Sequence, residues 1–209
     1  MKNMLLKNKT DYTKEKRDDK DNQTIVIKNS TPLKEILKLA PPCMCDACSN
    51  GCKFGSGSLI INEKLGLNDV KNIAKHLNIS EEELKKNYLE EIRRFNTKTF
   101  RTKLLRKKTP DGKELPFGRC IFYDDKIGCK IHEVKPVECK ISMGCKDYSE
   151  QLSQWFMLNF FVSSKDPESL RQYNAYLKSG GKTLVDGKLN NIMPDKKLLA
   201  KILNYEILS

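Results

Sequence analysis

The sequence predicts a mostly helical α+β fold, in which a compact cysteine-rich metal-binding core with short hairpins is backed by C-terminal helices. Three observations predict this class. Apolar residues recur at helical spacing in several capped segments, turn-forming Pro and Gly residues separate short apolar runs, and eight cysteines fall into two groups. A chain of 209 residues can bury its own core without disulfides, and 38% hydrophobic with 32% charged residues is typical of a globular protein.

Two regions differ in composition along the chain. Residues 1–23 are rich in Lys, Asp, Asn and Thr and have almost no apolar periodicity, so we expect a flexible tail there. Residues 24–209 are predicted to form a single domain. Within it we expect a cysteine module over 43–145 and a helical scaffold over 146–209.

The first elements after the tail are predicted from helix start and stop signals. Thr31-Pro32 favours a short helix from Leu33 to Leu39, which Pro41-Pro42 would end. A turn-rich stretch over 54–58 then leads into the apolar run Leu59-Ile60-Ile61. This run is either a strand or a packed connection.

Two capped helices are predicted next. Asn68 can cap a helix from Asp69 to about Leu77. Ser80 and Glu83 form a capping box, which indicates a second helix ending near Phe95. Its apolar residues recur every three or four positions, as on one buried helical face: Leu84, Tyr88, Leu89, Ile92 and Phe95.

The remaining segments are predicted as a hairpin and a set of helices. Residues 100–105 and 115–122 flank the turn sequence of 109–112, which favours a hairpin that leads into Cys120. Residues 148–162 are apolar nearly all round and include Trp155, so we expect a helix buried in the core. Asp166-Pro167 begins a further helix that Gly180-Gly181 ends. A hairpin around Asp186-Gly187 and a last helix over 195–207 complete the prediction.

The start of the chain and its charge indicate where the protein acts. Residues 1–7 have no apolar core of a secretory signal, and the longest apolar run, over 155–162, is too short to cross a bilayer. We therefore expect a cytoplasmic protein without a membrane partner. The net charge of +12 favours attraction to anions, such as an acidic protein partner or a nucleic acid.

The cysteines are the strongest functional signal. In a reducing compartment they stay thiols, and two groups of four predict metal ligands. The pattern Cys45-x2-Cys48-x3-Cys52 lets three thiolates of one loop converge, whereas the ligands of the second group must be gathered by the fold. The two groups are Cys43, Cys45, Cys48 and Cys52, followed by Cys120, Cys129, Cys139 and Cys145.

Four cysteine-containing segments between Cys45 and Cys139 follow one another in a recognisable order. This order resembles that of the YkgJ-type cysteine-cluster family, which is described as a zinc- or iron-chelating domain. The resemblance covers about 43–145. It departs from the family pattern in the spread Cys48-x3-Cys52, and in Lys135, which stands where the family has Arg. The resemblance implies that the cysteines chelate zinc or iron. The matching segments are Cys45-Asp46-Ala47-Cys48, Cys120-Ile121-Phe122-Tyr123, Gly128-Cys129-Lys130-Ile131-His132 and Pro136-Val137-Glu138-Cys139.

Eight thiols are compatible with two four-cysteine sites, one polynuclear centre, or one site with spare thiols. Zinc and iron–sulfur clusters both accept four thiolates. We favour an iron–sulfur cluster over zinc, because the second group lacks the paired CxxC knuckles of structural zinc. Among cluster types, we favour 4Fe–4S. Such a centre predicts an electron-transfer or accessory redox component of a larger complex.

The sequence contains none of the usual nucleotide-binding, serine hydrolase or zincin motifs, so no familiar enzyme class is predicted. If the chain is an enzyme, it is an iron–sulfur redox protein. Of its two histidines, His76 is expected to have an ordinary surface or packing role in a helix. His132, three residues after Cys129, is a weaker candidate for a ligand than the cysteines.

A second hypothesis gives zinc a structural role and makes the chain a nucleic-acid-binding module. Residues 93–108 contain eight basic residues and no acid, with Phe95 and Phe100 among them. Such a run could follow a phosphate backbone. The residues assigned to this role are Arg101, Lys103, Arg106 and Lys107.

Overall fold

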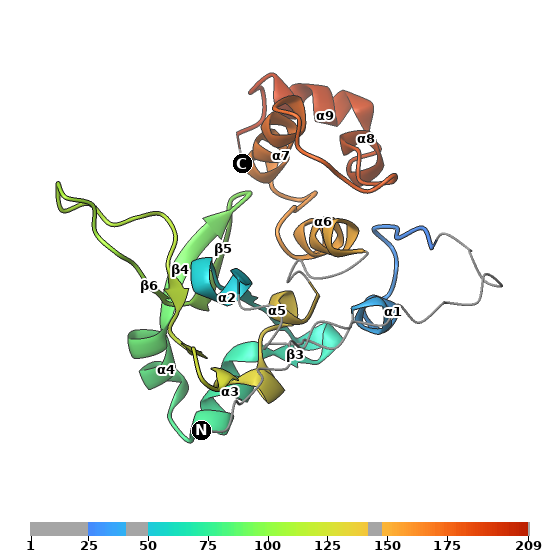
Figure 1. Cartoon of the computed structure of the whole chain (residues 1–209). Coiled ribbons are helices and arrows are strands. Elements are labelled where there is room, and N and C mark those ends of the chain that lie inside the picture. Colours follow the sequence, from blue (N-terminus) through green and yellow to red (C-terminus); the bar gives the residue numbers. More distant parts are fainter. Residues whose placement is uncertain (1–24, 41–49, 142–147, 209) are drawn as a thin grey trace, which may run out of the picture.

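The computed structural model describes residues 25–40, 50–141 and 148–208, and within these ranges the fold is α+β, as predicted (Figure 1). The predicted tail and four of the eight cysteines, Cys43, Cys45, Cys48 and Cys145, lie outside the described residues. No helix in the described ranges is long and apolar enough to cross a membrane.

The cysteine region is built on a small antiparallel sheet with the strand order β1-β5-β4. Its strands are β1 (Ser58–Leu59), β4 (Leu89–Arg94) and β5 (Thr97–Thr102). The other described strands form three two-stranded pairs: β2 (Ile61–Asn62) with β3 (Leu67–Asn68), β6 (Leu104–Leu105) with β7 (Arg119–Cys120), and β8 (Tyr123–Asp124) with β9 (Gly128–Cys129).

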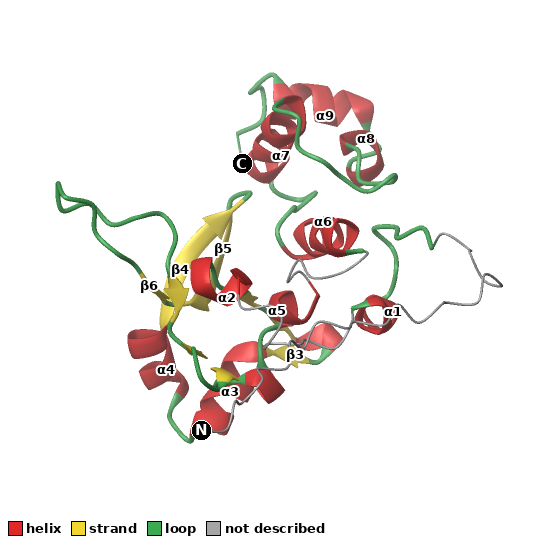
Figure 2. Ribbon diagram, viewed as in Figure 1, coloured by secondary structure: helices red, strands yellow, loops and turns green. Residues whose placement is uncertain are grey.

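Short helices surround these strands (Figure 2). The 3-10 helix η1 (Glu63–Leu65) joins β2 to β3, and a second one, η2 (His132–Val134), precedes α5. The α-helices of this region are α2 (Asn50–Phe54), α3 (Asp69–Leu77), α4 (Glu81–Tyr88) and α5 (Val137–Ile141).

The C-terminal part is helical, as expected, and α6 (Ser149–Phe160) is its buried centre. Trp155 and Phe156 are almost fully buried, which confirms the prediction of a core helix over 148–162. The N-terminal α1 (Leu33–Leu39) contributes Ile36 to the same apolar core. The other helices are α7 (Pro167–Lys178), α8 (Leu189–Ile192) and α9 (Lys196–Leu203).

Two clusters of buried apolar residues meet at β1 and α5. Leu59 belongs to the cluster of the cysteine region, whereas the next residue, Ile60, belongs to the cluster around α6. Successive side chains of an extended backbone point to opposite sides, so this segment contacts both clusters. On α5, Val137 and Ile141 also pack in the α6 cluster. The helical part therefore supports the helix that carries Cys139.

The prediction of one helix from Ser80 to Phe95 was wrong in its second half. The cap is confirmed, because the Ser80 side chain accepts a hydrogen bond from the Glu83 amide, but α4 ends at Tyr88. Residues 89–94 form β4, which pairs with β5 across a two-residue turn. Phe95 and Asn96 have φ values of 45° and 62°, as the common two-residue hairpin turn requires. The tight turn and the pairing of β4 with β5 over six residues favour a strand here, although the apolar residues have helical spacing.

Two further predictions need correction near the C-terminus. Residues around Asp186-Gly187 form a turn, with the Gly187 amide bonded to the Leu184 carbonyl, and none of the described residues flanking it is a strand. The last helix ends at Leu203, not Ile207, and Tyr205 adopts a φ of 61°. The helices predicted at 33–39 and 69–77 are confirmed at both ends. The hairpin that leads into Cys120 is confirmed as β6–β7.

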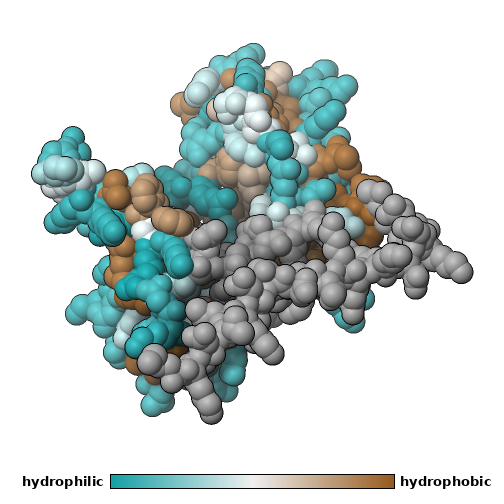
Figure 3. All heavy atoms as spheres, in the orientation of Figure 1, coloured by the Kyte–Doolittle hydropathy of each residue, from teal (hydrophilic) through white to brown (hydrophobic). Residues whose placement is uncertain are grey.

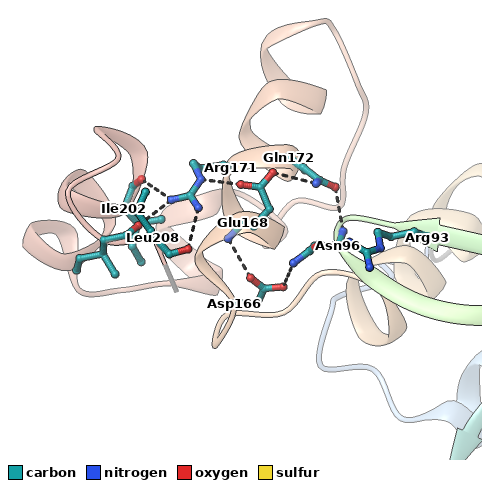
Figure 4. Close-up of polar contacts among 9 residues, drawn as sticks. Arg93, Asn96, Asp166, Glu168, Arg171, Gln172, Ile202 and Leu208 are labelled. Atoms are coloured by element: carbon teal, nitrogen blue, oxygen red, sulfur yellow. Dashed lines mark hydrogen bonds and ion pairs between the residues drawn. The ribbon is translucent and has the colours of Figure 1, made fainter.

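A polar network joins the β4–β5 turn to α7 (Figure 4). Asp166 caps α7 through the Glu168 amide, and its second carboxylate oxygen accepts a hydrogen bond of 2.8 Å from Asn96. On the same helix, the buried Arg171 donates to three main-chain carbonyls that follow or end α9, those of Ile202, Ile207 and Leu208. The network fixes the sheet turn and the C-terminal segment to one helix.

Replacing Asp166 with alanine should therefore cost more than the loss of an ordinary helix cap. We expect the free energy of unfolding to fall by about 2 kcal/mol, about 1 for the cap and about 1 for the bond to Asn96. Asp195→Ala is the matched control, because Asp195 caps α9 through the Leu198 amide and its side chain has no other hydrogen bond among the described residues. Urea unfolding of both variants checks this, and equal losses would contradict a link between α7 and the sheet.

Candidate metal centre

Four cysteine side chains line one small cavity of about 20 Å³ in the cysteine region. They come from four separate elements: Cys52 from α2, Cys120 from β7, Cys129 from β9 and Cys139 from α5. Cys52 belongs to the first group in the sequence and the other three to the second group. The fold therefore brings members of both groups to one place. The rest of the lining is Gly55, Ser56, Thr102, Ile131, Lys135 and Pro136.

Cys120 is held by the strand pair that the sequence predicts. It pairs with Leu104 of β6, and both side chains point to the buried side of this pair. Its Sγ lies 3.1 Å from the hydroxyl oxygen of Thr102, at the end of β5. Burial raises the pKa of the Cys120 thiol, while the Thr102 hydroxyl acts in the opposite direction. Thr102 can therefore donate to a thiolate at this position.

Cys139 is positioned by two carboxylates that anchor α5. Asp69 accepts hydrogen bonds from the amides of Ile60, at 2.8 Å, and of Val137, at 3.4 Å. It thus ties the first residue of α5 to the segment after β1. Glu138 accepts from the Ser58 amide at 2.5 Å and from the Arg94 side chain at 2.8 Å. The residue before Cys139 is therefore fixed to both edge strands of the sheet.

Gly57 leaves the space that the Cys139 side chain occupies. A Cβ atom added at Gly57 would collide with the Sγ of Cys139 and lie 3.2 Å from its amide nitrogen. In contrast, a Cβ at Gly55 would meet only the Gly51 carbonyl oxygen, at an ordinary distance of 3.4 Å. The segment after α2 can approach α5 this closely because residue 57 has no side chain.

The electrostatics of the cavity favour a bound cation. Burial raises the pKa of Cys139 well above its usual range, and the charges of Cys120, Glu138, Cys52 and Cys129 raise it further. Four thiolates in one site repel one another, and a metal ion or cluster offsets this repulsion. The chemistry of the donor atoms thus fits a thiolate-bound metal.

A buried hydroxyl supports the same interpretation. The Oγ of Ser56 is shielded from solvent and has no hydrogen-bond partner among the described residues. A buried unpaired hydroxyl is costly, and a thiolate or a cluster sulfur would satisfy it. Within 25–40, 50–141 and 148–208, no three His, Cys, Asp or Glu side chains form a metal-binding group by themselves. Cys43, Cys45, Cys48 and Cys145 lie outside these ranges.

Neither histidine is among the described residues that line the cavity. His76 is exposed on α3, as expected, and His132 is exposed on η2. Sequence reasoning missed the roles of Ser56, Thr102 and Asp69. Only the Gly-Ser-Gly-Ser stretch of 55–58 could have indicated a close approach of the backbone there. Lys135 was noted as a departure from the family pattern, and it is buried in the cavity wall.

Part of the basic run is neutralised by acids outside it. Glu90 of β4 binds both Arg101 and Arg106, each at 2.6 Å. Although burial alone would raise it, these hydrogen bonds lower the pKa of Glu90 below its usual value. Arg94 is bound to Glu138 in the same way, whereas Lys103 and Lys107 are exposed. Two of the four residues predicted to bind nucleic acid, Arg101 and Arg106, are therefore ion-paired with Glu90 of the sheet.

The comparisons with known proteins identify the family of this region. The family model CxxCxxCC, described as a "putative zinc- or iron-chelating domain", matches residues 44–157. This match covers more than half of the chain, from the first cysteine group into α6. The chain belongs to this family. The description of this family agrees with the zinc or iron chelation that the resemblance implied, and it supports metal binding by the cysteine region. No curated protein and no solved structure matches the chain.

The carboxylate that holds α5 should give the fold a recognisable pH dependence. Burial, opposed by hydrogen bonds from Ile60 and Val137, raises the pKa of Asp69 from 3.8 to about 6. Between about pH 4 and about pH 6, Asp69 therefore binds more protons in the folded chain than in the unfolded chain. For this reason its contribution to the free energy of unfolding falls as the pH rises from about 4 to about 6.

Asp69→Asn should remove this contribution. The difference in unfolding free energy between the Asp69→Asn variant and the wild-type protein should change across this pH window and stay constant above it. Urea unfolding at several pH values checks this. All cysteines are common to both proteins, so their titration cancels in the difference. A difference that does not depend on pH would contradict the assignment.

Proposed function

We propose that both cysteine groups serve one shared iron–sulfur centre, and that the chain is an electron-transfer or accessory redox component of a larger complex. The observation that carries this proposal is the common cavity of Cys52 and the three described members of the second group. Two sites divided by sequence group would separate Cys52 from the others. A shared centre is the alternative that this arrangement favours.

The number and spacing of the thiols favour iron–sulfur over zinc. A structural zinc ion takes four ligands, usually in closely spaced pairs. In the second group, 8, 9 and 5 residues lie between the successive members Cys120, Cys129, Cys139 and Cys145. Iron–sulfur clusters accept thiolates that separate elements contribute. A reducing compartment such as the cytoplasm suits these thiols.

The surrounding residues would tune such a centre. A bound iron–sulfur cluster supplies one-electron transfer. Thr102 and Ser56 offer hydroxyl donors to sulfur, and such hydrogen bonds raise the reduction potential. Ile131 and Pro136 form an apolar part of the wall and limit the access of water. The stem of Lys135 packs beside them.

Metal analysis of protein purified without oxygen tests the proposal. We expect iron and acid-labile sulfide in stoichiometric amounts, with a broad visible absorption that bleaches on reduction. Zinc in place of iron, with no visible spectrum, would refute the iron–sulfur assignment but keep the chelating site. Neither metal in stoichiometric amount would refute the metal centre itself.

A further inference from the structure

The strand pair that holds Cys120 has a second, solvent-exposed side. Leu104 and Cys120 are buried opposite each other, so their neighbours Leu105 and Arg119, which also pair, point outward. The hydrogen bonds from Ile121 to the Lys103 carbonyl and from Leu115 to the Lys107 carbonyl extend the pairing in both directions. One ribbon thus faces the thiols on one side and solvent on the other.

Exposed aromatic and basic side chains lie on this ribbon and beside it. Lys103, Leu105 and Lys107 alternate with less exposed residues along one arm, so they share one side. Phe117 of the other arm contacts Phe54 of α2, with ring centroids 6.2 Å apart in an edge-to-face arrangement. Phe54 is 60% exposed and Phe117 is 46% exposed. We call this surface the ribbon face: Phe54, Lys103, Leu105, Lys107, Phe117 and Arg119.

The ribbon face lies at an accessible place in the molecule. The loop between β6 and β7 projects at the left of Figure 1. Figure 3 shows hydrophobic atoms reaching the surface near the base of this projection. Gly118 allows the two arms to touch, because a Cβ there would collide with the Leu105 carbonyl. The close contact of the arms keeps Phe117 beside the arm that carries Lys103 and Lys107.

From these observations we propose that the ribbon face binds single-stranded nucleic acid. Exposed rings stack on bases of any sequence, and flanking cations follow the phosphates. Lys103 and Lys107 lie on either side of β6, and an extended backbone with a rise of about 3.3 Å per residue would place them about 13 Å apart. Glu90 neutralises Arg101 and Arg106, and Arg119 forms an ion pair of 3.2 Å with Asp125. Among the described residues, no salt bridge involves Lys103 or Lys107, so these two lysines are the cations of the proposal.

The same surface suits a protein partner less well. A stable protein interface buries about 800 Å² on each partner around an apolar centre. The ribbon face has only three exposed apolar side chains, Phe54, Leu105 and Phe117, which is too few for such a centre. Stacking on bases needs only the rings and the cations. The inference goes beyond the proposed redox function and does not depend on which metal is bound.

Fluorescence anisotropy with the full, metal-loaded chain tests the inference. The probes are labelled oligothymidylate and oligouridylate of about 12 nucleotides. We expect Phe54→Leu and Phe117→Leu each to weaken binding between about 5-fold and 100-fold through lost stacking. The pair Lys103→Gln and Lys107→Gln should lower the slope of log affinity against log salt by about 1.4. Metal content is measured for every variant.

Matched controls separate this result from general attraction to a basic protein. Lys196→Gln with Lys197→Gln makes the same charge change on exposed residues of α9 and should leave the affinity nearly unchanged. Phe54→Tyr keeps a ring and should keep the affinity. Absent binding at low salt, equal effects of the two lysine pairs, or equal loss in the Phe54→Leu and Phe54→Tyr variants would overturn the inference. Binding of a polyglutamate peptide instead of the oligonucleotides would also overturn it and indicate an acidic protein partner.

Discussion

Replacing Cys139 with serine should release the metal from the centre and unfold part of the cysteine region. Its thiol lies among Cys52, Cys120 and Cys129, and α5 is fixed through Glu138 and Asp69, so no neighbour can take its place. A serine hydroxyl is a poor ligand for a metal that prefers thiolates. Because metal binding contributes folding free energy, loss of the metal should also lower the melting temperature. Elemental analysis after desalting and a thermal melt measure both effects.

Cys43→Ser is the control for this result. Cys43 lies beside Pro41-Pro42, only two positions before Cys45, and outside the described residues. It is also outside the part of the first group that best matches the family pattern. We expect this variant to keep most of its metal, whereas Cys139→Ser and Cys129→Ser lose theirs. Equal metal content in the Cys43→Ser and Cys139→Ser variants would contradict this ranking of the ligands.

Adding a single methyl group at Gly57 should be nearly as damaging. In the Gly57→Ala variant the new Cβ would collide with the Cys139 Sγ, so the Cys139 side chain, α5 or the segment after α2 must move. Overpacking of this kind costs about 1–3 kcal/mol. The larger effect should be on the metal, because the displaced thiol is a ligand. Metal affinity, measured by competition with a chelator, should fall together with the unfolding free energy.

The neighbouring glycine provides a close control. Gly55 lines the same cavity, but a Cβ there meets only a carbonyl oxygen at 3.4 Å. Gly55→Ala should therefore keep the metal affinity. If the Gly57→Ala variant binds metal as tightly as the wild-type protein, this result would contradict the close packing of residue 57 against Cys139.

Local signals in the sequence predicted the helix starts well. Asn68, Ser80 and Asp166 all cap helices where their side chains indicated. The same signals could not predict where α4 ends, because Leu89 and Ile92 fit a helical face as well as a strand. Residues 89–94 form a strand because they pair with β5 across the left-handed turn at Phe95-Asn96. The sequence of residues 89–94 alone does not indicate this pairing.

The sequence singled out the four cysteines that line the cavity but not the residues that support them. Eight cysteines in two groups indicate metal without any knowledge of the fold. Thr102 and Asp69 are separated from Cys120 and Cys139 by many residues, and only tertiary packing brings them together. In the basic run, the sequence assigned a functional role to residues that have a structural one. It does not reveal that Glu90 neutralises Arg101 and Arg106.

The metal content of two single variants tests the central claim most directly. Cys52→Ser removes a thiol of the first group and Cys129→Ser removes one of the second, and both side chains line the same cavity. Iron, zinc and sulfide per chain are measured for both variants and for the wild-type protein, all purified without oxygen. A single shared centre predicts that each variant loses the whole metal content. If each variant keeps about half of the wild-type metal, the two groups hold independent sites and the account is contradicted.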